Sequence, residues 1–164
     1  CTAKTGADVI VREVGILSGA AGELGMVGGQ VLDLAGEDTV LTEDEVHTIH
    51  NLKTSALIRA ACQMGVAAAG GTQAQMDAAR DYAQALGMAF QIRDDMLDVL
   101  GDAEKMGKRT GMDEHKNTFV TLYGVGKCSQ LVEEYTKRAC AALSIFDRAQ
   151  FLDQLAARLA LREY

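Results

Sequence analysis

Three aspartates lie in a run of sequence over residues 90–100 that is apolar apart from them, Gln91 and Arg93. If this run is helical, Gln91, Asp94, Asp95 and Asp98 fall within an arc of about 100° on one face. Like charges one turn apart destabilise a helix, and burial makes clustered carboxylates costlier still. A bound cation would offset this repulsion. The spacing therefore predicts that the acidic face lines a cavity and binds a metal ion.

The types of ligand indicate which metal ion to expect. Carboxylate and amide oxygens without a nearby His or Cys favour Mg²⁺, which keeps part of its water shell and is commonly completed by substrate phosphates. The spacing does not match the calcium loop of an EF-hand, which needs oxygen ligands at alternating positions. A solvated acidic face is the usual alternative, and the surrounding apolar residues argue against it. We expect Asp94, Asp95 and Asp98 to bind Mg²⁺.

The sequence around the aspartates resembles the second aspartate-rich motif, DDxxD, of the trans-isoprenyl diphosphate synthases, the family of the farnesyl and geranylgeranyl diphosphate synthases. The resemblance includes Phe-Gln before the aspartates, Gly-Asp after them and Gly-Lys at 107–108. It implies an all-α bundle of the isoprenoid-synthase type. It also implies catalytic and substrate-binding roles for Gln91 and Lys108.

Two earlier segments carry the same resemblance. Residues 28–34 read GGQVLDL and are similar to the family element GGQxxDL, in which Gln30 and Asp33 would line the cavity near the diphosphates. Residues 50–54 read HNLKT and resemble the family segment HxxKT, in which Lys53 and Thr54 would hold the allylic diphosphate. Without the resemblance, the first interpretation of that lysine is a side chain extended along the edge of a bundle.

A basic segment follows the aspartates, at residues 101–111. Ammonium groups and backbone amides beside a metal-binding face are suited to surround a diphosphate. The family carries a second Lys before an NxTY-like segment, which corresponds to Lys116 and residues 117–119. The spacing before Lys116 is shorter than in the family, and Phe119 stands where Tyr is common. An ordinary surface loop is the alternative for this segment.

Composition indicates how these residues are positioned. The 164 residues are 48% hydrophobic but only 5% aromatic, and they include no proline. Abundant helix-forming residues and the lack of apolar and polar alternation favour an all-α chain. A cluster of glycines predicts a break within a first helical segment over residues 7–35, because each interior glycine costs about 1 kcal/mol relative to alanine.

Further helices are expected along the rest of the chain. Thr42 and Glu45 have the spacing of a capping box, so a helix should begin there. Within it, Lys53 and Thr54 follow a helical stripe from His50 to Leu57 and should share one face. A glycine turn precedes a long helix over residues 73–100, and terminal helices are expected over residues 126–147 and 150–162.

Charge and cysteine usage exclude several classes of function. Acidic residues outnumber basic ones by 23 to 16, giving a formal charge of −7, which argues against a nucleic-acid partner. The four cysteines form no CxxC pair and no zinc spacing. Neither a signal peptide nor a membrane-spanning apolar run is evident. These features predict a reduced, soluble, cytoplasmic protein.

The resemblance covers almost the whole chain but corresponds only to the C-terminal half of the family's bundle. The first DDxxD motif and the N-terminal basic segment of the family have no counterpart here. We therefore expect residues 1–164 to be one all-α segment, the C-terminal part of a synthase domain, inactive in isolation. The family resemblance implies that the complete protein is a homodimer.

The resemblance implies a transferase that condenses an allylic diphosphate with isopentenyl diphosphate, with farnesyl diphosphate the favoured product. Two alternatives from other classes stay open: a non-catalytic partner subunit of such a synthase, and a class I terpene cyclase. The missing first motif is compatible with the partner subunit. The Lys-Thr and Gly-Lys elements together argue against the cyclase.

Overall fold

The structure is a computed structural model that describes residues 6–105 and 117–162, and within these ranges every regular element is a helix. In chain order the elements are α1 (Ala7–Ala21), α2 (Met26–Ala35), α3 (Glu43–His50), η1 (Asn51–Ser55), α4 (Ala56–Ala68), α5 (Gln73–Lys105), α6 (Phe119–Ala142), η2 (Leu143–Ile145) and α7 (Gln150–Leu161). The prediction of an all-α chain is confirmed for the described residues.

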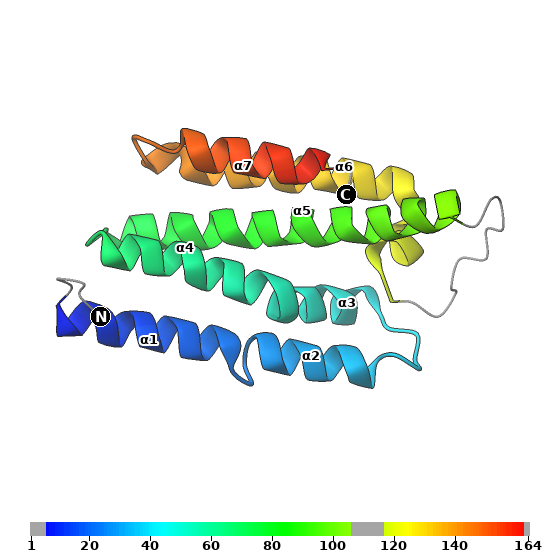
Figure 1. Cartoon of the computed structure of the whole chain (residues 1–164), viewed down its shortest axis with the longest axis horizontal. Helices are drawn as coiled ribbons and strands as arrows, with labels where there is room; N and C mark the ends of the chain where they lie inside the picture. Colours follow the sequence, from blue (N-terminus) through cyan, green and yellow to red (C-terminus); the bar gives the residue numbers. More distant parts are fainter. Residues whose placement is uncertain (1–5, 106–116, 163–164) are drawn as a thin grey trace.

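The helices lie in rows (Figure 1). Helices α1 and α2 run end to end and form the first row, separated by the glycine-containing break that the sequence predicts. Helix α1 has no buried residue. Large apolar side chains stay exposed along this row, namely Ile10, Val11, Val14, Leu17, Leu24, Val27, Val31, Leu32 and Leu34.

The second row contains α3, η1 and α4. The predicted capping box at its start is confirmed: Thr42 Oγ1 accepts the Glu45 N–H, and the Glu45 carboxylate accepts the Thr42 N–H over 2.8 Å. The helix does not stay α-helical, because residues 51–55 form the π-helix η1. Such wide turns are rare and often occur at functional sites.

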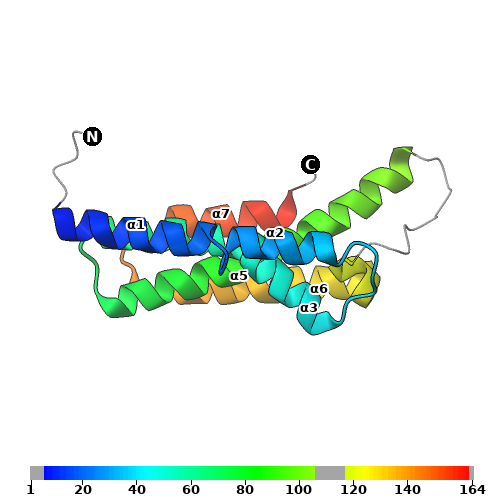
Figure 2. The ribbon, with the colours of Figure 1, turned by 90° about the horizontal axis from the view of Figure 1, so that it is seen from below.

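Helix α5 is the central element and contributes to both apolar cores. Its C-terminal part packs Ile92 and Met96 against Phe119 of α6, and its N-terminal part packs Tyr82 against the α6–α7 end of the bundle, near Leu143. The helix continues past the predicted end at residue 100 to Lys105. Its last turns project beyond the neighbouring helices (Figure 2).

Helix α6 begins earlier than the sequence predicts. A capping box between Thr118 and Thr121 starts the helix at Phe119, and Gly124, with φ of 74°, interrupts the helical geometry before the regular part that the sequence located from residue 126. Helix α7 matches its predicted range closely. None of the helices in the described ranges has the length and apolar character needed to cross a membrane.

Candidate functional site

Two of the cavities border α5, one beside its N-terminal part and the other beside Gln91, near its middle. The larger, about 600 Å³, is lined by Val66, Tyr82, Phe146, Leu152 and small residues, with no charged side chain among its described lining. The smaller, about 360 Å³, is lined by polar and charged side chains from several elements, including Asp33, His50, Lys53, Gln91 and Asn117. Charge and hydrogen-bonding capacity therefore place the candidate site at the smaller cavity.

Two glycines let neighbouring helices approach η1 closely, one from each side. A Cβ atom at Gly29 of α2 would lie 2.8 Å from the Cβ of Leu52. A Cβ atom at Gly87 of α5 would lie 2.9 Å from the Cβ of Ser55. Both distances are too short for non-bonded carbon atoms, so each contact requires a residue without a side chain.

On the α2 side of η1, Lys53 forms an ion pair with Asp33, which lies one turn after Gly29. The Lys53 Nζ is 2.6 Å from Asp33 Oδ2, and the two side chains remain 37% and 35% exposed. Gln30, also on α2, is half-buried. The structure therefore brings Asp33 and Lys53 together at the cavity.

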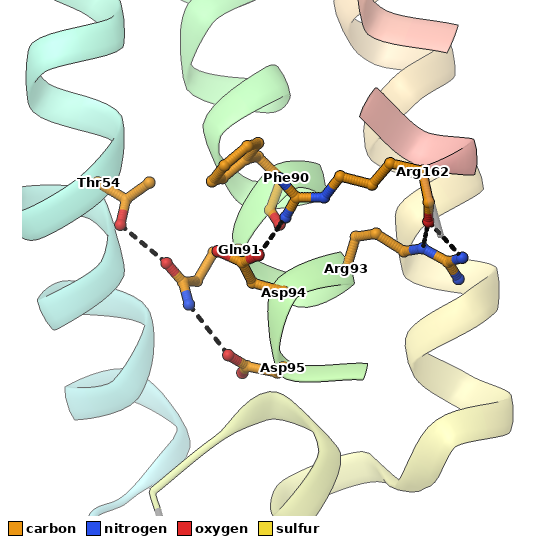
Figure 3. Close-up of polar contacts among 7 residues, drawn as sticks. All are labelled: Thr54, Phe90, Gln91, Arg93, Asp94, Asp95 and Arg162. Atoms are coloured by element: carbon orange, nitrogen blue, oxygen red, sulfur yellow. Dashed lines mark hydrogen bonds and ion pairs between the residues drawn. The ribbon is translucent and has the colours of Figure 1, made fainter. Parts of the chain in front are cut away.

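On the α5 side of η1, Thr54 begins a chain of hydrogen bonds that crosses α5 (Figure 3). Thr54 Oγ1 donates to Gln91 Oε1 over 2.9 Å, and Gln91 Nε2 donates to Asp95 Oδ1 over 3.0 Å. The other carboxylate oxygen of Asp95 accepts the backbone N–H of Phe119 over 2.8 Å. The chain therefore ends at the first residue of α6.

Lys53 and Thr54 contact different helices, so the prediction that they share one face is wrong. Lys53 contacts α2 and Thr54 contacts α5. The α-helical spacing from His50 to Leu57 does not apply, because the π-helix η1 lies between them.

The three aspartates of α5 enter three different environments. Asp95 is 5% exposed and faces α6, Asp94 pairs with Arg162 at the end of α7, and Asp98 is exposed. Within residues 6–105 and 117–162, no three His, Cys, Asp or Glu side chains converge as a ready metal-binding group. All three aspartates lie on α5, but their carboxylates differ in their partners: Asp94 pairs with Arg162, Asp95 accepts hydrogen bonds from Gln91 and Phe119, and Asp98 is exposed to solvent.

Arg162 is a residue that the sequence pattern did not single out. Its guanidinium pairs with Asp94 and lies 3.8 Å from the centroid of the Phe90 ring (Figure 3). Arg93 holds the same residue from the other side, donating from Nε and Nη2 to the Arg162 carbonyl over 2.9 and 2.7 Å. The sequence signal that could have indicated this contact was Arg93, because an arginine in a mostly apolar run needs a hydrogen-bond acceptor.

Burial shifts the protonation of two of the aspartates. It raises the pKa of Asp94 above its ordinary value, with Arg162 opposing the shift and Asp98 adding to it. Burial raises the pKa of Asp95 to about 6, while the hydrogen bonds from Gln91 and Phe119 act in the opposite direction. The carboxylate of Asp95 is therefore ionised at neutral pH but close to its titration range.

His50 lies against the cavity without a hydrogen-bond partner in the described structure. It is 8% exposed, neither ring nitrogen has a partner, and its ring centroid lies 4.9 Å from that of Phe119. Burial lowers the pKa of His50 to about 4, partly offset by the charge of Asp33. The ring is therefore neutral at physiological pH and contributes polarity without charge.

Asn117 ties the start of α6 to the loop between α2 and α3. Its Oδ1 accepts the N–H of Leu41 over 2.9 Å, and its Nδ2 donates to the carbonyls of Gly36 and Thr39 over 2.8 and 2.9 Å. The predicted site residues Lys108 and Lys116 lie outside the described residues. Asn117 thus marks where the described part of the cavity ends.

Comparison with known proteins identifies the family. The model of the Polyprenyl synthetase family matches residues 11–147, so this chain belongs to that family. The farnesyl diphosphate synthase of Escherichia coli (strain K12) is 41% identical over 143 residues, which cover 85% of this chain and 45% of that protein. The chain spans about half the length of the curated relatives it matches.

Solved structures share the fold. An FPP/GFPP synthase from Zymomonas mobilis superposes with a TM-score of 0.84 at 30% identity, covering 94% of this chain and 52% of that one. A geranyltransferase from Helicobacter pylori, solved with magnesium and isoprenyl diphosphate, has a TM-score of 0.76 at 31% identity, covering 98% of this chain and 53% of that one. The isoprenoid-synthase type of bundle that the sequence predicts is confirmed.

The donor atoms available here fit Mg²⁺. Asp94 retains a side chain that is 45% exposed, and Asp98 is exposed one turn later on the same helix. Mg²⁺ binds through one or two carboxylates plus waters and phosphate oxygens, so an open, incomplete set of oxygen ligands suits it. The arrangement is chemically compatible with a metal ion shared between this helix and a phosphate-bearing substrate.

Proposed function

We propose that this chain is the C-terminal part of a trans-prenyltransferase that condenses an allylic diphosphate with isopentenyl diphosphate. The observation that carries the proposal is that Lys53 and Gln91 both line the polar cavity, where Thr54 donates a hydrogen bond to Gln91, beside the Asp94–Asp98 turn of α5. Family membership supports the same reaction class. Farnesyl diphosphate is the product we favour.

The described side chains have separate tasks in this reaction. The ammonium group of Lys53 neutralises diphosphate charge, and Asp33 keeps that group at the cavity before the substrate binds. Thr54 and Gln91 present oxygen atoms to positive charge that develops on the allylic carbon. Lys108 and Lys116 add cationic contacts to the diphosphates in this proposal.

Bound Mg²⁺ would supply charge stabilisation for the leaving diphosphate. Asp94 and Asp98 are its open candidate ligands on this chain, and Asp95, the third aspartate of the predicted set, is buried. The allylic C–O bond breaks, the isopentenyl double bond attacks the allylic carbon to form the new C–C bond, and the departing diphosphate takes the proton that is lost. Such chemistry needs charge stabilisation more than a side-chain base. A neutral His50 at the cavity is compatible with that requirement.

Activity of the complete protein depends, in this proposal, on a second half that supplies the remaining metal ligands and the isopentenyl diphosphate site. The exposed apolar row of α1 and α2 supports a homodimer of the complete protein, because patches of this kind are uncommon on monomers. Sedimentation of the complete protein tests the pairing.

The test of function is a condensation assay on the complete protein with isopentenyl and allylic diphosphates and Mg²⁺. Asp94→Ala should lower turnover by orders of magnitude, because a metal ion supplies several kcal/mol of charge stabilisation. Asp77→Ala is the matched control, since Asp77 lies on the same helix with a side chain 44% exposed, against 45% for Asp94. Absence of prenyl product with the unmodified protein, or equal activity of both variants, would overturn the proposal.

A further inference from the structure

The second aspartate of the motif, Asp95, differs from its neighbours in burial and in its hydrogen-bond partners. Asp95 is 5% exposed, and both of its carboxylate oxygens already accept hydrogen bonds, from Gln91 Nε2 and from the Phe119 N–H. Asp94 and Asp98 remain much more open to solvent. A metal ion at Asp95 would have to compete with two bonds inside the protein.

We propose that Asp95 is a positioning residue that fixes the orientation of the Gln91 amide, and through it the Thr54 hydroxyl, while anchoring the first turn of α6. This inference rests on the proposed function for its catalytic meaning, but its structural content stands on the hydrogen bonds alone. It assigns Asp95 a task different from the metal ligation expected from its place in the motif.

The orientation follows from which groups can donate. Asp95 as a carboxylate only accepts, so it selects the NH₂ group of Gln91 and turns the Gln91 Oε1 toward Thr54. The Thr54 hydroxyl then donates its single hydrogen to that oxygen, so only its lone pairs remain for other contacts. A cationic centre near Thr54 therefore meets an acceptor rather than a donor.

The same carboxylate fixes the entry into α6. The first backbone N–H groups of a helix lack partners within the helix, and Asp95 satisfies that of Phe119. Asn117, two residues earlier, is held by the loop between α2 and α3. One side chain thereby connects η1, α5 and the start of α6, which border the polar cavity.

A reciprocal exchange tests this arrangement in the complete protein. Asp95→Asn alone turns the Gln91 amide around, because the new NH₂ group needs an acceptor. Gln91→Glu alone sets two carboxylates against each other. The double variant restores every donor and acceptor at unchanged net charge: the Glu carboxylate accepts from Thr54 and from the Asn amide, whose oxygen still accepts from Phe119.

Each single variant should lose about tenfold or more in kcat, and the double variant should recover most of that loss. The Mg²⁺ concentration for half-maximal activity should stay unchanged in Asp95→Asn but rise in Asp94→Asn. If Asp95 is a metal ligand instead, Asp95→Asn raises the Mg²⁺ requirement and the double variant recovers nothing, which overturns the inference.

Two measurements are independent of turnover. The melting temperature of the metal-free protein should fall in each single variant and recover in the double variant. Hydrogen exchange of the Phe119 amide should speed up in Asp95→Ala, while that of Thr121, bonded to Thr118 Oγ1, should not. If the unmodified protein makes no prenyl product, the proposed function fails while these measurements still decide the inference; no recovery and no change in exchange overturn it.

Discussion

The two sides of η1 use the same local arrangement in different surroundings. On each side a glycine allows close approach, and a polar residue one turn later meets η1: Asp33 follows Gly29 on α2, and Gln91 follows Gly87 on α5. The α2 side ends in an ion pair about one-third exposed. The α5 side continues into a chain of hydrogen bonds that begins at the partly buried Thr54 and Gln91 and reaches α6 through the buried carboxylate of Asp95.

Under the proposed function, this difference separates two requirements of a diphosphate site. The ammonium group of Lys53, which the proposed function assigns to the diphosphate, lies where water can reach it, paired with Asp33 of the outer row. Groups whose orientation matters sit where packing fixes them.

Gly87→Ala should cause the largest loss of stability. The added methyl group would lie 2.9 Å from the Ser55 Cβ and 3.0 Å from its Cα, in the centre of the bundle. Overpacking costs about 1–3 kcal/mol and here involves backbone, so we expect a net loss of at least about 2 kcal/mol despite the better helix propensity of alanine. Gly65→Ala in α4 is the control, because its Cβ would meet nothing within 4 Å. Denaturant unfolding measures both, and equal stability would contradict the close contact.

Acidification should destabilise the buried side through His50. Its folded pKa of about 4 lies below the ordinary 6.5, so the folded state binds fewer protons and stability is lost as pH falls through 6.5 toward 4. The loss attributable to His50 between about pH 7 and about pH 5 should be about 2 kcal/mol.

Asp95 acts in the opposite direction, because its pKa is raised to about 6 and the folded state gains protons as pH falls through that value. The informative quantity is therefore the difference in unfolding free energy between wild type and His50→Gln as a function of pH. A difference that does not change with pH would contradict the burial of a neutral ring.

A Cβ at Gly29 would overlap the backbone N of Lys53, so Gly29→Ala requires α2 to shift. Because α2 lies in the outer row, we expect that shift to cost less than Gly87→Ala, about 1 kcal/mol net. The movement should separate Lys53 from Asp33 and weaken binding of inorganic diphosphate by the complete protein. Gly15→Ala in α1 is the control, since its Cβ meets nothing within 4 Å. Calorimetric titration measures the affinity; an unchanged value would show that α2 does not position Lys53.

The smallest effect belongs to the Lys53–Asp33 pair itself. A double-mutant cycle with Lys53→Met and Asp33→Asn should give a coupling energy below about 1 kcal/mol that falls with added salt, because both groups are partly exposed. Glu133 and Lys137, with side chains 71% and 79% exposed, provide a weaker reference pair. A coupling energy well above about 1 kcal/mol would show that the Lys53–Asp33 pair behaves as a buried ion pair and would contradict the contrast between the two sides of η1.

The sequence predicted the helices more completely than the side-chain contacts between them. Residue types show capping, breaks and helix-forming composition, so the start at Thr42 and the break before α2 were predictable. Motif spacing also led to Lys53 and Gln91. It did not reveal the π-helix, because a change from α to π hydrogen bonding leaves no clear trace in residue types.

The different environments of the three aspartates could not be predicted from the sequence either. Periodicity places Asp94, Asp95 and Asp98 on one helix face, but whether each meets solvent, Arg162 or a backbone amide depends on how α6 and α7 pack. Arg93 indicated that an acceptor must lie near, without showing that it is the carbonyl of Arg162.

The π-helix η1 determines how far α3 is rotated about the helix axis relative to α4. Inserting or removing one residue in a continuous helix turns the part before it by about 100° relative to the part after it. Loss of one residue from 51–55 would swing Val46, Ile49 and His50, now buried, away from α5 and α6. The angular position of α3 around its own axis is therefore set by the number of residues in η1, whatever their side chains.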